Sequence, residues 1–120
     1  METIWKTVFR KLKENGINVY PPATKIGECK TEYVVIKQDG SSQVGSFSSE
    51  FVYYHFMLYV PANRYSYLSE YEKKVKDIIN KELYPLLVPT DSNMADYFDD
   101  EVKAHMRSFI YRNSVRNRHL

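Results

Sequence analysis

The sequence of 120 residues has little of several features that define common protein classes. It contains a single cysteine, Cys29, so neither an internal disulfide nor a multi-cysteine zinc site is expected, and a reducing compartment suits the chain. The first residues hold neither a basic segment nor a long apolar core, and no apolar run approaches the ~20 residues that span a membrane. A formal net charge of +2 gives no general argument for binding nucleic acid. The sequence therefore predicts a protein that is made and kept in the cytosol.

Tyrosine is the residue in excess, with eleven tyrosines against six phenylalanines and one tryptophan. Tyrosine is enriched in protein interfaces because its ring can be buried while its hydroxyl stays hydrogen-bonded, although a place on a sheet surface is the better prediction for any one of them. The 43% of hydrophobic and 27% of charged residues predict one ordered domain over 1–120, with 113–120 as a basic C-terminal tail. A domain of this size has little stability to spare, so help from neighbouring chains is expected.

Hydrophobic periodicity predicts the secondary structure. Ile4, Val8 and Leu12 recur at helical spacing, and residues 33–37 form a β-branched, nearly continuous apolar run that is typical of a buried strand. A capping box at 69–72 is expected to begin a second helix. The predicted helices cover 3–14 and 68–84, and the predicted strands cover 17–20, 33–37, 46–60 and 102–111. The expected fold is α+β, with a small, mainly antiparallel sheet of about four strands and two main helices packed on one face.

The segment 97–112 is the most informative part of the sequence. An acidic turn runs into a stretch of period-2 alternation, which predicts a strand with two different faces. One face carries Val102, Ala104, Met106, Ser108 and Ile110, and we expect it to meet the core. The other face carries cations and two aromatic rings, and we expect it to meet a partner. The interface residues assigned on this basis are Lys103, His105, Arg107, Phe109, Tyr111 and Arg112, together with Arg116 and Arg118 of the tail.

Acidic and basic residues are also separated along this part of the chain. The acids come first, at Asp91, Asp96, Asp99, Asp100 and Glu101, and only basic residues follow them among the charged positions up to residue 120. Such an arrangement permits head-to-tail pairing between copies of the chain. A small sheet also has edges that must be shielded or paired with another chain. Both features favour a binding role.

Two alternatives use the same residues. Glu101-Val102-Lys103 matches the second half of a nuclease signature in which this glutamate and an upstream aspartate, here Asp91, Asp96 or Asp99, hold magnesium beside the lysine. The triplet is common by chance and the usual signature takes its acid from a separate strand, so acids that cap a turn are the favoured interpretation. Nucleic-acid binding by the basic tail is the second alternative, but the strand lacks an aromatic stacking motif. We assign no catalytic residue, metal ligand or cofactor site.

Four segments resemble the tail terminator, or tail-completion, proteins of long-tailed bacteriophages and of phage-tail-like bacteriocins. The segments are Asn-Val-Tyr-Pro-Pro at 18–22, Glu-Tyr-Val-Val-Ile-Lys at 32–37, Leu-Tyr-Val-Pro at 58–61, and residues 97–112. Together they span most of the chain, and the last is the most distinctive.

The resemblance implies a small α+β subunit that forms a hexameric ring at the head-proximal end of the tail tube and stops its polymerisation there. In a phage the ring also offers the surface to which the head attaches, whereas in a headless particle it ends the particle. The implied partners are further copies of the chain, the tail tube protein and a sheath or head–tail connector protein, with no membrane and no specific nucleic acid. The family has no catalytic residues or cofactor. The protein is then expected in the bacterial host cytoplasm during assembly and later at the head-proximal end of the tail.

Overall fold

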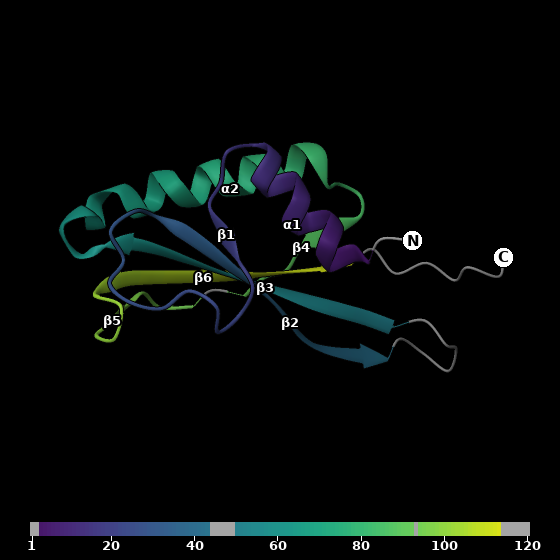
Figure 1. Ribbon diagram of the computed structural model, residues 1–120. Helices are drawn as coiled ribbons and strands as arrows, with labels where there is room; N and C mark the ends of the chain where they lie inside the picture. Colours follow the sequence, from purple (N-terminus) through teal and green to yellow (C-terminus); the bar gives the residue numbers. More distant parts are fainter. Residues whose placement is uncertain (1–2, 44–49, 93, 114–120) are drawn as a thin grey trace, which may run out of the picture.

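Two helices lie over one face of a mixed, six-stranded sheet (Figure 1). This computed structural model describes residues 3–43, 50–92 and 94–113. The helices are α1 (Ile4–Glu14) and α2 (Leu68–Glu82), and the strands are β1 (Val19–Tyr20), β2 (Tyr33–Gln43), β3 (Glu50–Pro61), β4 (Leu87–Pro89), β5 (Tyr97–Asp99) and β6 (Ala104–Asn113). The expected α+β class is confirmed, but the sheet has six strands rather than about four.

α1 forms as its sequence predicts. The hydroxyl of Thr3 accepts a hydrogen bond from the amide of Lys6 at 3.2 Å and so caps the first turn. Val8 and Leu12, one turn apart, are fully buried against the sheet. The chain leaves the helix through Gly16, whose φ of +83° lies in the left-handed region that favours glycine.

α2 begins differently from the prediction. A 3-10 helix, η1 (Ala62–Tyr67), follows β3 directly and leads into α2 without a side-chain cap. The expected capping box is not formed, because Ser69 lies within the first turn of α2 and its hydroxyl accepts a hydrogen bond from Arg107 instead. The helix itself is confirmed, although it ends at Glu82 rather than at residue 84. Its buried residues recur at helical spacing: Leu68, Tyr71, Val75 and Ile79.

β3 is the central strand of the sheet. The strand order is β1-β2-β3-β6-β4, with β5 also beside β6, and only the β1–β2 pair is parallel. β2 continues through the turn that the sequence predicted at 38–42. A register shift between Gln38 and Ser41 absorbs the Asp-Gly pair as a bulge, after which pairing with β3 resumes. The start of the predicted strand 46–60 lies outside the described residues, and β3 is described from Glu50.

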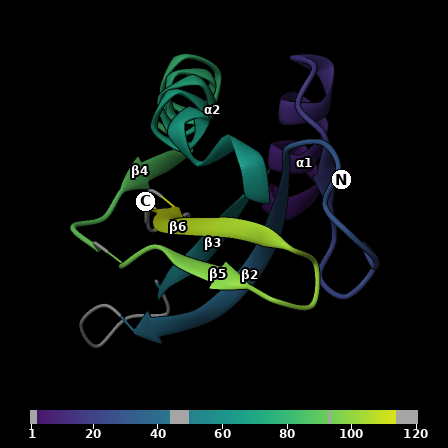
Figure 2. The same ribbon diagram turned by 90° about the vertical axis from the view of Figure 1, so that its left-hand side faces the viewer.

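β4 and β5 are the strands that the sequence analysis missed. Each has three residues, and Pro89 and Asp99 at their ends belong to residue types that are rare in strands. Both pair with the outer edge of β6, β4 near its end and β5 near its start. Between them, the amide and the hydroxyl of Thr90 both donate to the carbonyl oxygen of Ile110, at 3.2 and 2.7 Å. β6 therefore has neighbours on both sides (Figure 2).

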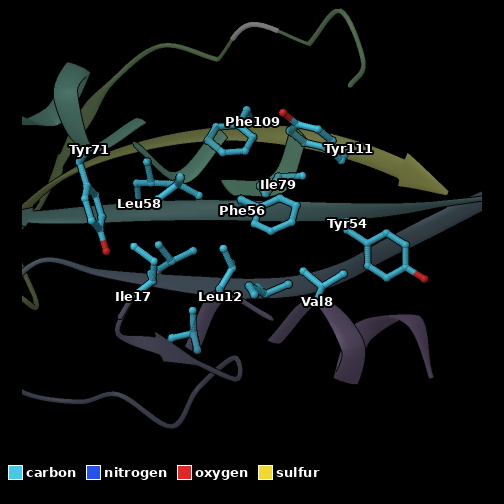
Figure 3. Packing of buried hydrophobic residues seen from close by; sticks show 14 of the residues in the cluster. Val8, Leu12, Ile17, Tyr54, Phe56, Leu58, Tyr71, Ile79, Phe109 and Tyr111 are labelled. Carbon is cyan, nitrogen blue, oxygen red and sulfur yellow. The ribbon is translucent and has the colours of Figure 1, made fainter. Parts of the chain in front are cut away.

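The main hydrophobic core lies between the helices and the sheet (Figure 3). Phe56 of β3 stacks on Phe109 of β6 with ring centroids 5.4 Å apart, and Tyr111 meets Phe56 edge-on at 5.7 Å. Burying one such side chain contributes about 1.5–3 kcal/mol. The indole N–H of Trp5 donates to the carbonyl oxygen of Ile36 at 2.9 Å. This bond joins α1 to β2 at the side of the sheet.

Candidate functional site

The closing strand β6 is covered on both faces. Ala104, Met106 and Ser108 are buried, as expected for the face that meets a core, but the other face is not open. His105, Arg107, Phe109 and Tyr111 were expected on an open face, yet they lie on the side of the sheet that the helices and η1 cover. Phe109 and Tyr111 are only 4% and 1% exposed. The expectation that these two rings are open to a partner is wrong, because two large rings remove more apolar area from water than the alanine and serine of the other face.

Both rings also have polar or charged neighbours within the chain. The hydroxyl of Tyr111 donates to Oδ1 of Asn80 at 3.0 Å, and burial raises the pKa of this phenol, so that it stays a donor. The ammonium of Lys76 lies 4.7 Å from the centroid of the Phe109 ring. Both contacts come from α2, so this helix fixes the orientation of β6.

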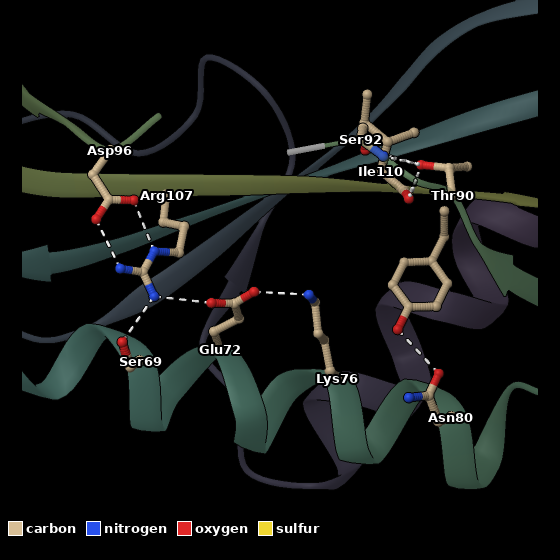
Figure 4. Close-up of polar contacts among 10 residues, drawn as sticks. Ser69, Glu72, Lys76, Asn80, Thr90, Ser92, Asp96, Arg107 and Ile110 are labelled. Carbon is tan, nitrogen blue, oxygen red and sulfur yellow. Dashed lines mark hydrogen bonds and ion pairs between the residues drawn. The ribbon is translucent and has the colours of Figure 1, made fainter. Parts of the chain in front are cut away.

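Arg107 is the centre of an ion network that joins three parts of the chain (Figure 4). Its Nε and Nη2 donate to the two carboxylate oxygens of Asp96, each at 2.7 Å. Such a bidentate pair is among the stronger hydrogen-bonded contacts in proteins. Its Nη1 donates to Glu72 at 2.9 Å and to Ser69 at 3.0 Å, both on α2, and Lys76 lies 2.7 Å from the other oxygen of Glu72. The network thus joins α2 to the segment before β5, and β6 lies between them.

The network changes the pKa values of its members. Hydrogen bonds from Arg107 lower the pKa of Asp96. Burial opposes ionisation of Glu72, but hydrogen bonds from Lys76 and Arg107 outweigh it and lower the pKa of this carboxyl. The hydrogen bond with Asp96 is the main cause of a raised pKa for Arg107. The side chains of Arg107, Glu72 and Asp96 are only 20%, 25% and 24% exposed. Arg107, assigned above to a partner contact, thus has acidic partners within its own chain.

Lys103 and His105, near the start of the predicted strand 102–111, lie in different surroundings. Lys103 is exposed and lies in the turn before β6, with a φ of +55° in the left-handed region, so it does not share the face of the strand. The Nε2 of His105 donates to the carbonyl oxygen of Ala62 at 3.1 Å. The ring of His105 also contacts Tyr65 and Phe98, with centroids 4.8 and 5.0 Å away.

A second hydrophobic cluster lies on the face of the sheet without helices, which we call the helix-free face. The cluster contains Cys29, Tyr33, Val35 and Ala104, and the partly buried Tyr20, Met57, Tyr59 and Val102 pack against it. Tyr33 stacks on Tyr59 with centroids 4.9 Å apart, and Tyr20 meets Tyr33 edge-on at 5.5 Å. The tyrosine excess of the sequence is thus partly a ring cluster on this face.

A hollow of ≈ 240 Å³ opens on the helix-free face, and we call it the aromatic pocket. The residues that line it are Pro22, Ala23, Lys25, Tyr33, Val35, Met57, Tyr59, Asp99, Glu101 and Val102. The ammonium of Lys25 lies 5.7 Å from the centroids of both the Tyr20 and Tyr33 rings, within reach of a cation–π interaction. Burial, with smaller contributions from Tyr97 and Asp99, raises the pKa of Tyr59 to about 12. The phenol therefore stays neutral beside the two carboxylates of the pocket.

Arg112 is the expected interface residue that faces away from the helices. Its guanidinium carbon lies 4.0 Å from the centroid of the Phe51 ring. It lines a separate hollow of ≈ 320 Å³ together with Tyr53, Thr90 and Asp91. Arg116 and Arg118, and with them all of the predicted tail except Asn113, lie outside the described residues. A partner contact at Arg112 stays a prediction.

Of the three candidate acids in the nuclease alternative, Asp99 lies beside Glu101, whereas Asp91 and Asp96 have other neighbours. Asp96 binds Arg107, and Asp91 lines the hollow beside Arg112. Oδ1 of Asp99 accepts the amide of Glu101 at 2.9 Å, which is the turn-capping role favoured from sequence. Within residues 3–43, 50–92 and 94–113, no three His, Cys, Asp or Glu side chains are placed to hold a metal ion together.

Sequence reasoning missed Lys25, Tyr33 and Tyr59 as a group. The period-2 pattern does place Tyr33 with Val35, and Met57 with Tyr59, on one face of their strands. The pattern does not give the register between β2 and β3, which places Tyr33 opposite Tyr59. The position of Lys25 depends on how the loop before β2 folds, which no local pattern specifies.

Comparisons of the sequence with family models and with curated proteins give no match from which a function could be transferred. No protein-family model matches the sequence, and no curated protein sequence is significantly similar to it. In the part of the chain that the structure describes, no helix is long and apolar enough to cross a membrane.

Proposed function

We propose that this protein is a structural assembly protein of a long phage tail or a tail-like particle, which forms a ring at the head-proximal end of the tail tube. There it stops polymerisation of the tube and, where a head exists, offers the surface that the head joins. The resemblance of residues 97–112 and of three shorter segments is the starting point. The fold supports the proposal because it offers several surfaces of different chemistry for contacts with other chains.

The β2–β3 hairpin is the observation that supports the proposal most. The two strands extend beyond the helices, as Figure 1 shows. β1 pairs with β2 only at Val34 and Val35, and no other strand of the described residues pairs with this outer side of β2. A strand edge without a neighbour is a template for a strand of another chain.

The direction of the backbone groups identifies where such pairing would begin. The amide of Val34 points outward and donates to the carbonyl oxygen of Asn18 at 2.8 Å, and the carbonyl of Ile36 points outward to Trp5. Because these groups alternate in direction along a strand, the amide and carbonyl of Gln38 also point outward, just before the register shift. The outer edge from Gln38 onward can thus add to a sheet in another chain of the particle.

The opposite end of the molecule carries exposed rings. Tyr65, Tyr97 and Phe98 are 50%, 51% and 40% exposed, and β5 lies at the far end of the sheet from the hairpin (Figure 1). Exposed aromatic residues are enriched in protein interfaces. A terminator needs such asymmetry, because it must bind the last tube ring on one side and present another side to which no tube ring can bind.

The proposed partners are further copies of the chain in a hexameric ring, the tail tube protein, and a sheath or head–tail connector protein. A closed ring uses a heterologous contact, in which two different surfaces of each subunit meet around a rotation axis. The proposal requires no cofactor, membrane or nucleic acid. It places the protein in the host cytoplasm during assembly and at the end of the tail afterwards.

The test is electron microscopy of particles co-purified with the tagged protein and the products of its neighbouring genes. We expect a ring of several copies at the head-proximal tube end, and a single copy per tail end would contradict the proposal. Gln38→Pro removes the outward amide, whereas Gln38→Ala keeps it and serves as the control. We expect the proline variant to fold but fail to join particles. If it joins them as the alanine variant does, the strand-edge contact is wrong.

A further inference from the structure

The described sheet has one edge that suits a further strand and others that do not. On the outer side of β4, the amide of Leu87 already donates to the carbonyl oxygen of Leu83 at 2.8 Å, and Pro89 has no amide. β1 and β5 have two and three residues, too few to hold a further strand on their own. Among the described strands, the longest side without a neighbour is the outer side of β2 over residues 38–43, which we call the open edge.

The open edge continues past the bulge to the end of β2. The amide of Val52 points to β6, since it donates to Oδ1 of Asn113 at 2.9 Å. Backbone groups alternate in direction along a strand, so those of Phe51 point to β2 and meet Ser42, which lies opposite. The residues on either side of Ser42 therefore point their amides and carbonyls outward, as Gln38 does before the bulge.

Residues 114–120, which we call the tail segment, suit this edge in composition and length. Their sequence, Ser-Val-Arg-Asn-Arg-His-Leu, has no proline or glycine, so every residue can pair through its amide and its carbonyl. The segment has two arginines and no acid, whereas residues 38–50 have two acids and no lysine or arginine. Fully extended, the tail segment spans ~23 Å and the open edge ~20 Å.

The tail segment cannot cover the open edge of its own chain. It follows β6, and both β3 and β2 lie between β6 and the open edge. Three strand spacings of ~4.8 Å, about 14 Å in all, therefore separate the end of β6 from the place of an added strand. Crossing this distance takes about four extended residues, which leaves only about three of the segment for pairing. Pairing along the whole edge requires the tail segment of another chain.

We infer that the tail segment of one copy adds as a strand to the open edge of β2 in the next copy. This inference rests on the proposed ring, since it names the contact between neighbouring subunits. A ring joins two different surfaces of each subunit, and the tail segment and the open edge are such a pair. Two open edges that paired with each other would instead give a closed dimer. Arg116 and Arg118 are two residues apart, so both lie on one face of the added strand.

Two proline variants break this contact from its two sides. Gln38→Pro removes an outward amide of the open edge, and Arg116→Pro removes an amide of the tail segment. Gln38→Ala and Arg116→Ala keep these amides and are the matched controls. In sedimentation of the purified full-length protein, each proline variant alone should weaken self-association at least about tenfold, and each alanine variant should stay within about threefold of the wild type.

A mixture of the two proline variants tests the direction of the contact. Arg116→Pro keeps an intact open edge and Gln38→Pro keeps an intact tail segment, so one contact can form between them. We expect one-to-one dimers and nothing larger from the mixture, whereas the wild type grows beyond dimers. A wild type that stays monomeric up to about 1 mM, or a mixture of folded variants without dimers, would overturn the inference.

Arg116→Pro is decisive by itself, because it leaves every contact among the described residues in place. Self-association of this variant at wild-type strength would show that the tail segment does not make the contact. Hydrogen exchange locates the other side. In the associated wild type the amide of Gln38 should exchange at least about tenfold more slowly than in Arg116→Pro at the same concentration, and equal exchange would place the contact elsewhere and overturn the inference.

The two proposals can fail separately. If Arg116→Pro assembles into rings on tails as the wild type does, the tail-segment contact is wrong and the ring proposal stands. If Arg116→Pro abolishes self-association while tails of normal length form without the protein, the ring proposal is wrong and the tail-segment contact stands.

Discussion

Replacing Arg107 by methionine tests the ion network, because it removes the guanidinium and keeps an unbranched apolar stem. The change leaves Asp96 and Glu72 without the cation that they share. Removing one partner of a fully buried pair costs about 3–5 kcal/mol. The three side chains are still 20%, 24% and 25% exposed, so water screens part of this loss. We expect the free energy of unfolding to fall by about 2–3 kcal/mol.

The assay is urea unfolding at neutral pH, followed by circular dichroism. The same loss lowers the thermal midpoint by roughly 10 °C for a domain of this size. Arg112→Met is the matched control, since Arg112 is on the same strand and its guanidinium meets the Phe51 ring and donates to the carbonyl of Asn113. It should cost less than about 1 kcal/mol. An Arg107→Met protein within about 0.5 kcal/mol of the wild type would refute the assigned role of the network.

The pH dependence provides an independent readout of the same network. Asp96 and Glu72 have lowered pKa values in the folded protein. Their contribution is therefore complete above the unfolded pKa values of about 4 and is lost as the pH falls through the lower folded values. The stability difference between wild type and Arg107→Met should be constant from pH 7 to about 5 and shrink below about pH 4. A difference that persists unchanged in strong acid would contradict this account.

Three further predictions separate core, turn and catalytic roles. Phe109→Ala should lower the free energy of unfolding in urea by about 3–5 kcal/mol, because Phe109 is a core residue and not a surface one, and a change below about 1 kcal/mol would contradict its burial. Lys103→Gly should raise the free energy of unfolding by roughly 0.5 kcal/mol, because relief of the left-handed backbone strain at this residue outweighs the added entropy of the unfolded chain. Lys103→Ala, which keeps the strain, is the control. Purified protein with magnesium should not cleave DNA, and cleavage that Glu101→Gln abolishes would establish the nuclease alternative.

Elements with a long apolar pattern could be predicted from the sequence. The helical spacing of Val8 and Leu12 and the β-branched run at 33–37 each bury one face, so local pattern and tertiary packing agree there. β4 and β5 could not be predicted in this way, because three-residue strands form only where an existing edge, here that of β6, offers them partners.

The candidate site was harder to predict because it depends on distant partners. Alternation along β6 shows that two faces differ, but it does not show which one meets the helices. Phe109 and Tyr111 were the better indicator, since large rings remove more apolar area from water than Ala104 and Ser108 do. The role of Arg107 depends on Asp96 and Glu72, which reach it from a loop and from α2. No spacing rule within β6 contains that information.

The length distribution of tails made without this protein tests the central claim most directly. Particles are compared by electron microscopy after disruption of its gene and after complementation with the intact gene. If the protein ends the tube, tails made without it overgrow to variable lengths and complementation restores a uniform length. Tails of uniform, wild-type length in the complete absence of the protein would contradict the terminator role.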